Sequence, residues 1–289
     1  MSKMGPLQTG DTNRLLGYPP DARLLIINAD DLGMCHAVNA AILRSLQEGV
    51  VCSTTVMVPC PWALHALQLL SDHPEMSFGV HLTLISDTAT YRWGPLTSRD
   101  KVPSLVDESG YFYLYDRIPA FLAQVQLAEV EVEFRAQIEA VLARSLQPTH
   151  LDWHCLYNGG RADIFEVTVK LAQEYGLAVR VFDRATGDAL RRQGLPTAEH
   201  DVLDSYRLDT AGKSARFAQL LHDLPVGLSE WAVHPGLEDG ELRAIHADGA
   251  RRRQTDFDFL ISAEARALIH QEGITLLSYK PLQAVWQAR

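Results

Sequence analysis

Carboxylate and imidazole side chains follow several apolar segments of this chain. Asp30 and Asp31 follow the run LLII after Asn28 and Ala29, and His81 lies within VHLTL. His154 ends THLDWH, and His234 begins HPG. Carboxylate and neutral imidazole form a common ligand set for catalytic divalent metals, and three protein ligands leave positions open for water and substrate. If the fold brings these residues together, they predict metal-assisted hydrolysis.

The adjacent pair Asp30 and Asp31 suits two different roles. Side chains alternate along a strand, so the two carboxylates diverge only where the strand ends. One can then bind a metal while the other serves as a base. The competing interpretation is that one aspartate caps the following helix. A single histidine in an apolar strand is more often structural than a ligand, so the prediction depends on the whole set.

Strand-like and helix-like segments alternate along the chain, which is typical of a parallel sheet with helices outside it. About seven such units predict an α/β fold, a TIM-like parallel (β/α) barrel that is distorted or incomplete. A doubly wound open sheet is the alternative, although no GxGxxG follows the first strand. In either fold, the residues after the strands meet at one edge. The predicted strands are 24–27, 50–58, 78–84, 150–153, 177–182, 230–233 and 274–278, and the predicted helices are 36–48, 61–73, 128–146, 162–175, 214–222 and 263–271.

Two regions depart from this alternation. Residues 1–20 are polar and rich in Gly and Pro, which predicts a flexible N-terminal extension before a single barrel domain at 21–289. Residues 85–117 form a long irregular insertion, and such segments are often functional lids. We expect Trp93 and Tyr91 in this insertion to bind a sugar ring, although they could equally pack the insertion onto the barrel.

The fourth and fifth predicted strands carry supporting polar residues. In THLDWH, His150, Asp152 and His154 share one parity and can face the same side. His154 is nearest the mouth of the barrel, so Asp152 is expected to orient a ligand and His150 to be structural or supporting. Arg180 interrupts the apolar strand LAVRVF, and a buried charge is costly unless it is paired. We expect Arg180 to steady Asp30; a purely structural ion pair is the alternative.

The composition excludes several classes of partner. With 36 acidic and 26 basic residues, the net charge of −10 disfavours nucleic acid, and the run at 251–253 is interpreted as a solvated face. Four cysteines without a CxxC pair favour reduced thiols and a cytoplasmic location. One of them, Cys155, is expected to pack rather than react. No segment reaches the ~20 apolar residues of a membrane helix, so no membrane partner is expected.

The motifs NADDLG, GVHLTL, THLDWH and VHPG, in this order, resemble those of the YdjC-like carbohydrate deacetylases, which include chitooligosaccharide and hopanoid-type enzymes. The closing segment ISAEARALIHQEGITLLSYKPL also looks like theirs, and the resemblance covers residues 22–282. It implies a barrel-like fold and one divalent metal ion, Mg²⁺ or Zn²⁺. Asp31, His81 and His154 would hold the metal, and Asp30 would be the base. Many relatives continue THLDSH with further histidines, whereas here Cys155 follows.

The predicted reaction is removal of an acetyl group from an N-acetylated sugar. Asp30 takes a proton from a metal-activated water, and His234 protonates the leaving amine. The alternatives are another metal-dependent barrel hydrolase, acting on a phosphoester or cyclic amide, and a non-catalytic sugar-binding relative. We expect a small carbohydrate as partner and a possible homodimer.

Overall fold

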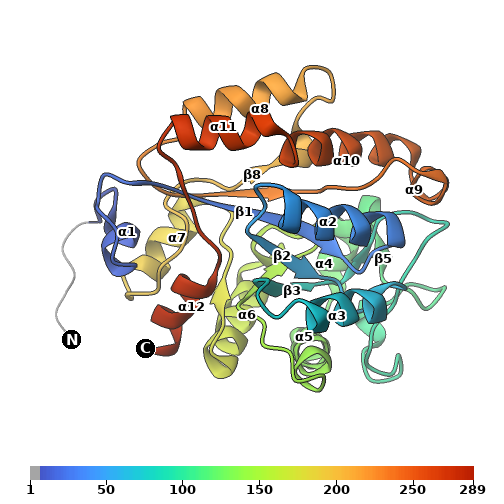
Figure 1. Cartoon of the computed structure of the whole chain (residues 1–289). Helices are drawn as coiled ribbons and strands as arrows, with labels where there is room; N and C mark the ends of the chain where they lie inside the picture. Colours follow the sequence, from blue (N-terminus) through green and yellow to red (C-terminus); the bar gives the residue numbers. More distant parts are fainter. Residues whose placement is uncertain (1–6) are drawn as a thin grey trace.

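The protein is built on an eight-stranded sheet in which every paired strand runs parallel to its neighbour (Figure 1). A computed structural model describes residues 7–289. The order of the strands is β7-β6-β3-β2-β1-β9-β8, and β10 pairs with the first half of β1. The strands are β1 (Arg23–Leu32), β2 (Ser53–Val56), β3 (Phe78–Leu82), β6 (His150–Trp153), β7 (Ala178–Val179), β8 (Leu203–Asp204), β9 (Gly227–Val233) and β10 (Thr275–Leu276).

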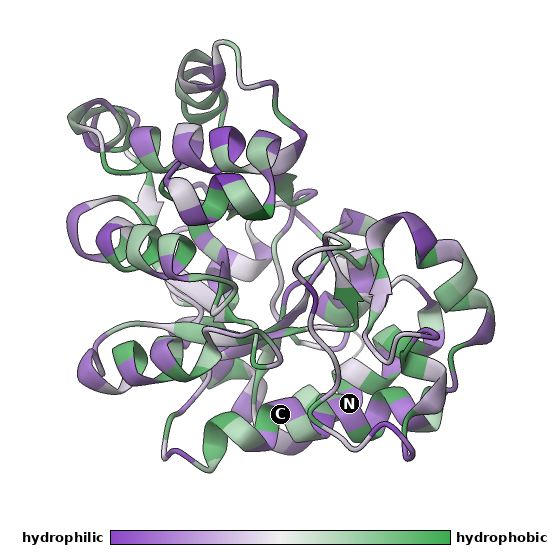
Figure 2. Cartoon of the chain, turned by 90° about the vertical axis from the view of Figure 1, so that its right-hand side faces the viewer, coloured by the Kyte–Doolittle hydropathy of each residue, from purple (hydrophilic) through white to green (hydrophobic). Residues whose placement is uncertain are grey.

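The helices cover the outside of the sheet. In Figure 2, which views the molecule from the right-hand side of Figure 1, they surround the strands and show apolar and polar stretches in turn. They are α1 (Asp11–Leu15), α2 (His36–Glu48), α3 (Ala63–Asp72), α4 (Ile118–Gln124), α5 (Leu127–Leu142), α6 (Ala162–Tyr175), α7 (Arg184–Arg191), α8 (Lys213–His222), α9 (Gly240–Ile245), α10 (Ala247–Leu260), α11 (Ala263–Gln271) and α12 (Lys280–Gln287).

The sheet curls into a half-barrel that does not close. Its two ends, β7 and β8, share no ladder within residues 7–289, and a backbone hydrogen bond from Val202 to Phe182 bridges the gap near them. The prediction of an incomplete parallel barrel is therefore confirmed. None of the helices described over residues 7–289 has both the length and the apolar character needed to cross a membrane.

Most predicted elements are present. Strands β1 and β9 are longer than predicted, whereas the strands predicted at 50–58, 78–84, 177–182 and 274–278 are shorter. The strand predicted at 177–182 is reduced to two residues, Ala178–Val179, because the chain leaves the ladder at Arg180. Helices α1, α4, α7, α9, α10 and α12 were not predicted. All but α10 have eight residues or fewer, and α10 is rich in charged residues, so none shows a long helical apolar stripe. This omission matters because α10 carries residues that reach the centre of the barrel.

The insertion at 85–117 is packed rather than loose. It contains β4 (Ile85–Ser86), β5 (Tyr113–Leu114) and the short 3₁₀ segments Pro103–Leu105 and Tyr115–Arg117. Strands β4 and β5 form a separate parallel pair, on the right of Figure 1 beyond the end of β1. Phe112 and Leu105 are fully buried, so the insertion has an apolar core of its own that continues into the barrel core.

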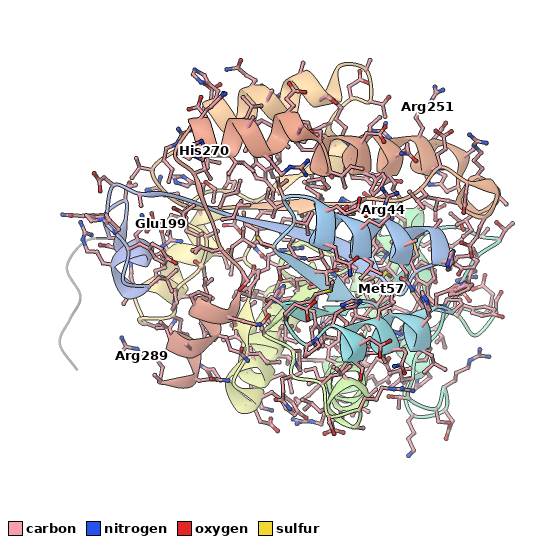
Figure 3. All side chains as sticks on the ribbon, viewed as in Figure 1. Arg44, Met57, Glu199, Arg251, His270 and Arg289 are labelled. Atoms are coloured by element: carbon pink, nitrogen blue, oxygen red, sulfur yellow. The ribbon has the colours of Figure 1, made fainter. Side chains whose placement is uncertain are left out.

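The prediction of a loose extension over residues 1–20 is wrong for residues 10–13; residues 1–6 lie outside the described part. The side chains of Thr12 and Asn13 are fully buried. The carboxylate of Glu199 accepts hydrogen bonds from the backbone N–H of Gly10, at 2.8 Å, and of Thr12, at 2.7 Å (Glu199 is labelled in Figure 3). This tertiary partner satisfies the free N–H groups of α1, which composition alone does not reveal.

We predict that Glu199→Ala releases this segment. Two buried backbone donors lose their acceptor, which costs about 1–3 kcal/mol of unfolding free energy for each unsatisfied group. Urea unfolding should show the loss, and brief trypsin digestion should cleave after Arg14 much faster than in the wild type. Glu264→Ala, which removes an exposed carboxylate, is the control. Equal digestion rates in both variants would contradict the proposed anchoring.

Candidate metal centre and active site

The register of β3 against β6 places His81 directly beside Asp152. Both side chains face the inside of the barrel, and His81 Nδ1 lies 2.7 Å from a carboxylate oxygen of Asp152. No side chain fits at Gly79, two residues earlier on β3, because a Cβ there would lie 2.5 Å from the carbonyl oxygen of His150. The ring of His150 fills that space and stacks on Tyr279 at 3.6 Å between centroids, so His150 is structural.

A β-bulge aims both aspartates of β1 into the barrel. Ala29 pairs with Thr54 and Leu32 with Val56, so Asp30 and Asp31 together oppose a single residue of β2. Asp31 adopts the left-handed conformation, with φ of 73°, which aspartate tolerates better than most residues. The strict alternation of side chains is broken at this point. Both carboxylates therefore face the interior, although the strand continues through both residues.

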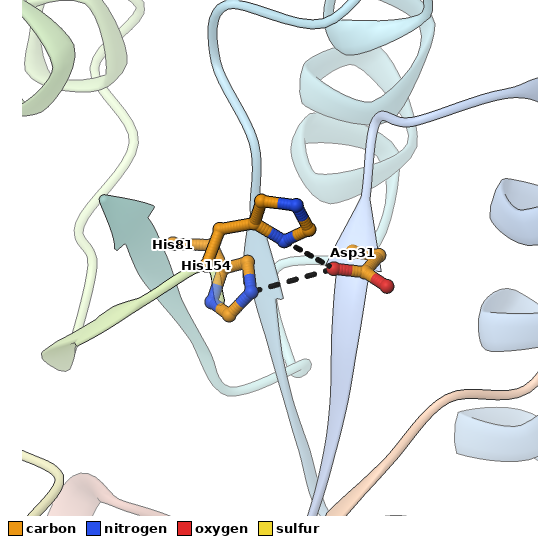
Figure 4. Close-up of side chains that lie close together, drawn as sticks. All are labelled: Asp31, His81 and His154. Atoms are coloured by element: carbon orange, nitrogen blue, oxygen red, sulfur yellow. Dashed lines mark hydrogen bonds and ion pairs between the residues drawn. The ribbon is translucent and has the colours of Figure 1, made fainter. Parts of the chain in front are cut away.

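Asp31, His81 and His154 converge on one point (Figure 4). One carboxylate oxygen of Asp31 lies 3.1 Å from His154 Nδ1 and 3.4 Å from His81 Nε2. All three side chains are buried. These three donor atoms lie close enough to one another to share a cation. The donor set, one carboxylate and two imidazoles, is the one expected for a catalytic divalent metal, so the residues fit such an ion.

Further carboxylates fix the outer sides of the two histidines. Asp152 holds His81 Nδ1, which directs the lone pair of Nε2 toward Asp31. Asp87, from the insertion, lies 2.6 Å from His154 Nε2. Burial alone would lower the pKa of His81, yet the charges of Asp152 and Asp30, together with the hydrogen bonds to Asp152 and Asp31, outweigh burial and raise this pKa to about 9. A cation that binds here displaces a proton from His81.

Arg180 pairs with three buried carboxylates at the centre of the barrel. Its Nη1 and Nη2 lie 2.7 and 2.9 Å from the two oxygens of Asp30, as predicted. Nη1 is also 2.7 Å from Asp152, and Nε is 2.7 Å from Glu230. Tyr279 donates its hydroxyl hydrogen to the other oxygen of Glu230. The guanidinium therefore links strands β1, β6 and β9 from inside.

This pairing sets the charge of Asp30. Burial alone would raise the pKa of its carboxyl group, but the guanidinium of Arg180, together with the imidazoles of His81 and His234, outweighs burial and holds the pKa well below its usual range. Asn28 donates a further hydrogen bond to Asp30 Oδ1 at 2.8 Å. Asp30 is therefore ionised at neutral pH and fixed in orientation.

His234 lies across the cavity from the metal-ligand candidates. Its Nε2 is 3.9 Å from Asp30 Oδ2, and its Nδ1 is 3.1 Å from the hydroxyl of Ser205. Ser205 donates to Asp256, so its oxygen is left to accept from His234 Nδ1. Asp256 is in turn paired with the buried Lys213. This chain of contacts directs His234 Nε2 toward Asp30 and the cavity.

A cavity of about 320 Å³ opens above these groups. The predicted catalytic and metal-binding residues that line it are Asp30, Asp31, His81, His154 and His234. Arg180 is fully buried and does not line the cavity, although it is paired with Asp30. The remaining lining of the cavity includes aromatic side chains from several loops, namely Tyr115, Tyr157, Phe182 and Tyr206.

The two aromatic residues predicted to bind sugar, Trp93 and Tyr91, do not line this cavity. Trp93 is buried, and its indole N–H donates to the carbonyl of Ile85 at 2.7 Å. Its ring meets His154 edge to face, with centroids 5.8 Å apart. The hydroxyl of Tyr91 donates to the carbonyl of Met34. Their positions fit the alternative role, in which they pack the insertion onto the barrel.

Two residues that contact the metal-ligand candidates, Arg253 and Asp87, were not predicted. Arg253 was interpreted as part of a solvated basic run, but it is buried and its Nη2 lies 2.6 Å from Asp31 Oδ2. Helical geometry explains the difference, because neighbouring residues of α10 face different sides: Arg251 points outward while Arg253 points inward (Arg251 is labelled in Figure 3). Asp87 was hidden in the irregular insertion, where no periodicity indicates which side chains turn inward.

The sequence matches a known protein family. The family model described as YdjC-like protein matches residues 24–271. The chain belongs to the YdjC-like family. The resemblance inferred from the four motifs is therefore confirmed, and the matched region includes every residue of the candidate centre.

Proteins named carbohydrate deacetylase match along most of the chain. A carbohydrate deacetylase of Enterococcus faecalis is 34% identical over 267 residues, which covers 89% of this chain and 97% of the relative. A carbohydrate deacetylase of Thermoanaerobacter pseudethanolicus is 28% identical over 263 residues, or 90% and 100% of the two chains. A solved structure from Enterococcus faecalis V583, provisionally assigned to cellobiose-phosphate cleavage, is 32% identical with a TM-score of 0.79, covering 90% and 99% of the chains.

The Arg180 network makes a strong prediction for stability. Arg180→Met leaves three buried carboxylates without their cation, and breaking a buried ion pair in this way costs about 3–5 kcal/mol. Urea unfolding should show this loss, whereas Arg251→Met, at an exposed position, should change the free energy of unfolding by less than about 0.5 kcal/mol. Similar unfolding midpoints for the two variants would contradict the central role of Arg180.

Proposed function

We propose that the protein is a carbohydrate deacetylase that hydrolyses the acetamide of an N-acetylated sugar. The observation that carries the proposal is the convergence of Asp31, His81 and His154 beside the ionised Asp30, at the floor of a cavity. Membership of a family whose relatives include enzymes named carbohydrate deacetylase supports the same reaction. An amide requires both a nucleophile and protonation of its leaving amine, and this site offers a group for each.

Asp31 Oδ1, His81 Nε2 and His154 Nδ1 are the atoms that would hold one divalent ion, Mg²⁺ or Zn²⁺. When bound, such an ion polarises the acetyl carbonyl and lowers the pKa of the attacking water. Two imidazoles beside one carboxylate favour Zn²⁺ on ligand softness. Arg253 fixes the second oxygen of Asp31, which leaves Oδ1 directed at the two histidines.

Asp30 is the group that accepts a proton from the attacking water. Its carboxylate faces the cavity, and the pairing with Arg180 keeps it ionised before the reaction. The same pairing makes Asp30 a weak base. A weak base would be sufficient if a cation held by Asp31, His81 and His154 acidified the water, and Asp30 would then only need to receive the proton.

His234 is the group that protonates the leaving amine. Its Nε2 faces the cavity on the side of Asp30, at 3.9 Å from that carboxylate. A proton that Asp30 accepts can therefore reach His234 over a short path, or be shared with it. Ser205 and Asp256 hold the opposite edge of the ring, so that Nε2 stays in place during the transfer.

The rim of the cavity suits a sugar ring. Tyr115 and Tyr157 are exposed there, and Tyr157 packs against Phe182 with ring centroids 4.3 Å apart. Aromatic faces present an apolar surface on which the C–H face of a sugar can stack. We assign the sugar to these residues, and we assign Trp93 and Tyr91 to holding the insertion and His154 in position.

The cysteine chemistry supports a reducing compartment such as the cytoplasm. Cys35, Cys52, Cys60 and Cys155 are all free thiols, and thiols persist where glutathione and thioredoxin keep them reduced. A homodimer stays a prediction, which the elution volume on size-exclusion chromatography with light scattering would test.

The first prediction from this proposal is metal-dependent acetate release. With added Mg²⁺ or Zn²⁺, the protein should release acetate from members of a panel of N-acetylated mono- and disaccharides, and EDTA should stop the release. Asp30→Asn should lower kcat by about 10²–10⁴-fold, because the proton acceptor is lost. Asp258→Asn, at an exposed carboxylate, is the matched control.

Other results of the acetate-release experiment would each support a different conclusion. Full activity in Asp30→Asn would remove Asp30 from the role of base. No acetate from any sugar, with metal bound, would favour a phosphoester or cyclic amide as substrate. No bound metal at all would favour a non-catalytic sugar-binding protein.

The second prediction concerns His234. If it protonates the leaving group, His234→Ala should lower acetate release from a sugar amide by about 10²–10⁴-fold. Hydrolysis of para-nitrophenyl acetate should suffer much less, because that leaving group departs without a proton. Equal losses with both substrates would show that His234 acts on binding or structure instead.

A further inference from the structure

A second cluster of metal-binding side chains lies on the outer side of His154. Its members are Asp87 from the insertion, His154, and Cys155, which directly follows it. His154 Nε2 lies 2.6 Å from Asp87 Oδ1 and 3.2 Å from the sulfur of Cys155. The sulfur is 3.6 Å from the same carboxylate oxygen. None of these contacts involves Asp31 or His81, which face the other ring nitrogen.

The backbone conformation of Cys155 creates this arrangement. Its φ is 60°, in the left-handed region that residues with a side chain rarely adopt. The turn brings the sulfur back beside the imidazole of the preceding residue instead of letting it point away. Cys155 is half-buried and lines the cavity, so a small cation can reach it from solvent. The packing role expected for Cys155 does not require such a conformation.

We propose that Asp87, His154 and Cys155 form a second metal site, selective for a thiophilic cation such as Zn²⁺. Zinc accepts thiolate, imidazole and carboxylate in a tetrahedron, whose ligand atoms lie roughly 3.3–3.7 Å apart. The 3.6 Å between the sulfur and Asp87 already matches this spacing, and the 3.2 Å between the sulfur and His154 falls just below it. Only the Asp87–His154 pair must widen from hydrogen-bond distance, and Asp87 lies in the insertion with part of its side chain exposed. Binding releases the thiol proton of Cys155 and the proton shared between His154 and Asp87.

The second site competes with the first for His154. A neutral imidazole has one lone pair, so it offers either Nδ1 toward Asp31 or Nε2 toward Cys155. Occupation of the thiolate site therefore takes a ligand from the proposed catalytic centre. Mg²⁺ prefers oxygen ligands and gains little from sulfur, so it should leave the second site empty. The consequence is that excess zinc inhibits while magnesium does not.

Cobalt(II) is the direct probe of thiolate ligation. Metal-free protein titrated with Co²⁺ should develop a thiolate-to-cobalt charge-transfer band in the near ultraviolet, and added Zn²⁺ should abolish it. Cys155→Ser should lose the band, because a hydroxyl does not give this transition. Cys52→Ser should keep it, since Cys52 lies away from the cavity against Ile27 and Leu277. Thermal unfolding of each variant verifies that the fold is retained.

One variant separates this site from the proposed catalytic centre. His81→Ala removes a ligand of the first site only, so it should keep the charge-transfer band and lose metal-dependent acetate release. A band that is absent from the wild type, or that persists undiminished in Cys155→Ser, would overturn the second site. This readout does not depend on deacetylase activity, so its failure is distinguishable from failure of the proposed function.

Discussion

The contact between Arg180 and three buried carboxylates is the interaction on which the rest of the structure depends. The guanidinium bonds to Asp30 on β1, Asp152 on β6 and Glu230 on β9. Strands β1 and β9 are neighbours, but β2 and β3 separate β6 from β1, so the cation connects two parts of the open sheet from inside. Burial of these charges is costly, and the cost is offset only while every partner is present. The same contacts orient Asp152 toward His81 and keep Asp30 ionised, so stability and chemistry share one set of atoms.

A local irregularity makes this arrangement possible. In a regular strand, adjacent aspartates would point to opposite faces, and one carboxylate would be lost to the helices outside. The bulge opposite Thr55 and the left-handed conformation of Asp31 turn both inward. Asp30 then meets Arg180 while Asp31 meets the two histidines and Arg253. Two neighbouring residues thus serve two different parts of the centre.

The sequence predicted a parallel barrel that is distorted or incomplete, and it predicted that Asp31, His81 and His154 lie where strands end, because alternation and strand ends are local features. The pairing of Arg180 with Asp30 was also predictable, since a charge in an apolar strand requires a partner. Glu230 carries the same signal within an apolar strand and could have been found by it. Arg253 and Asp87 could not, because one lies in a polar helix and the other in an irregular segment. Their orientation depends on tertiary packing, as does the anchoring of residues 10–13.

The central claim is that Asp31, His81 and His154 hold one divalent ion beside Asp30. Anomalous diffraction from crystals soaked in Mn²⁺, which prefers oxygen and imidazole ligands, tests this claim most directly. The account predicts one strong anomalous peak within bonding distance of Asp31 Oδ1, His81 Nε2 and His154 Nδ1, and loss of that peak in His81→Ala. An anomalous peak only at another place in the molecule, or no peak at saturating Mn²⁺, would contradict the account.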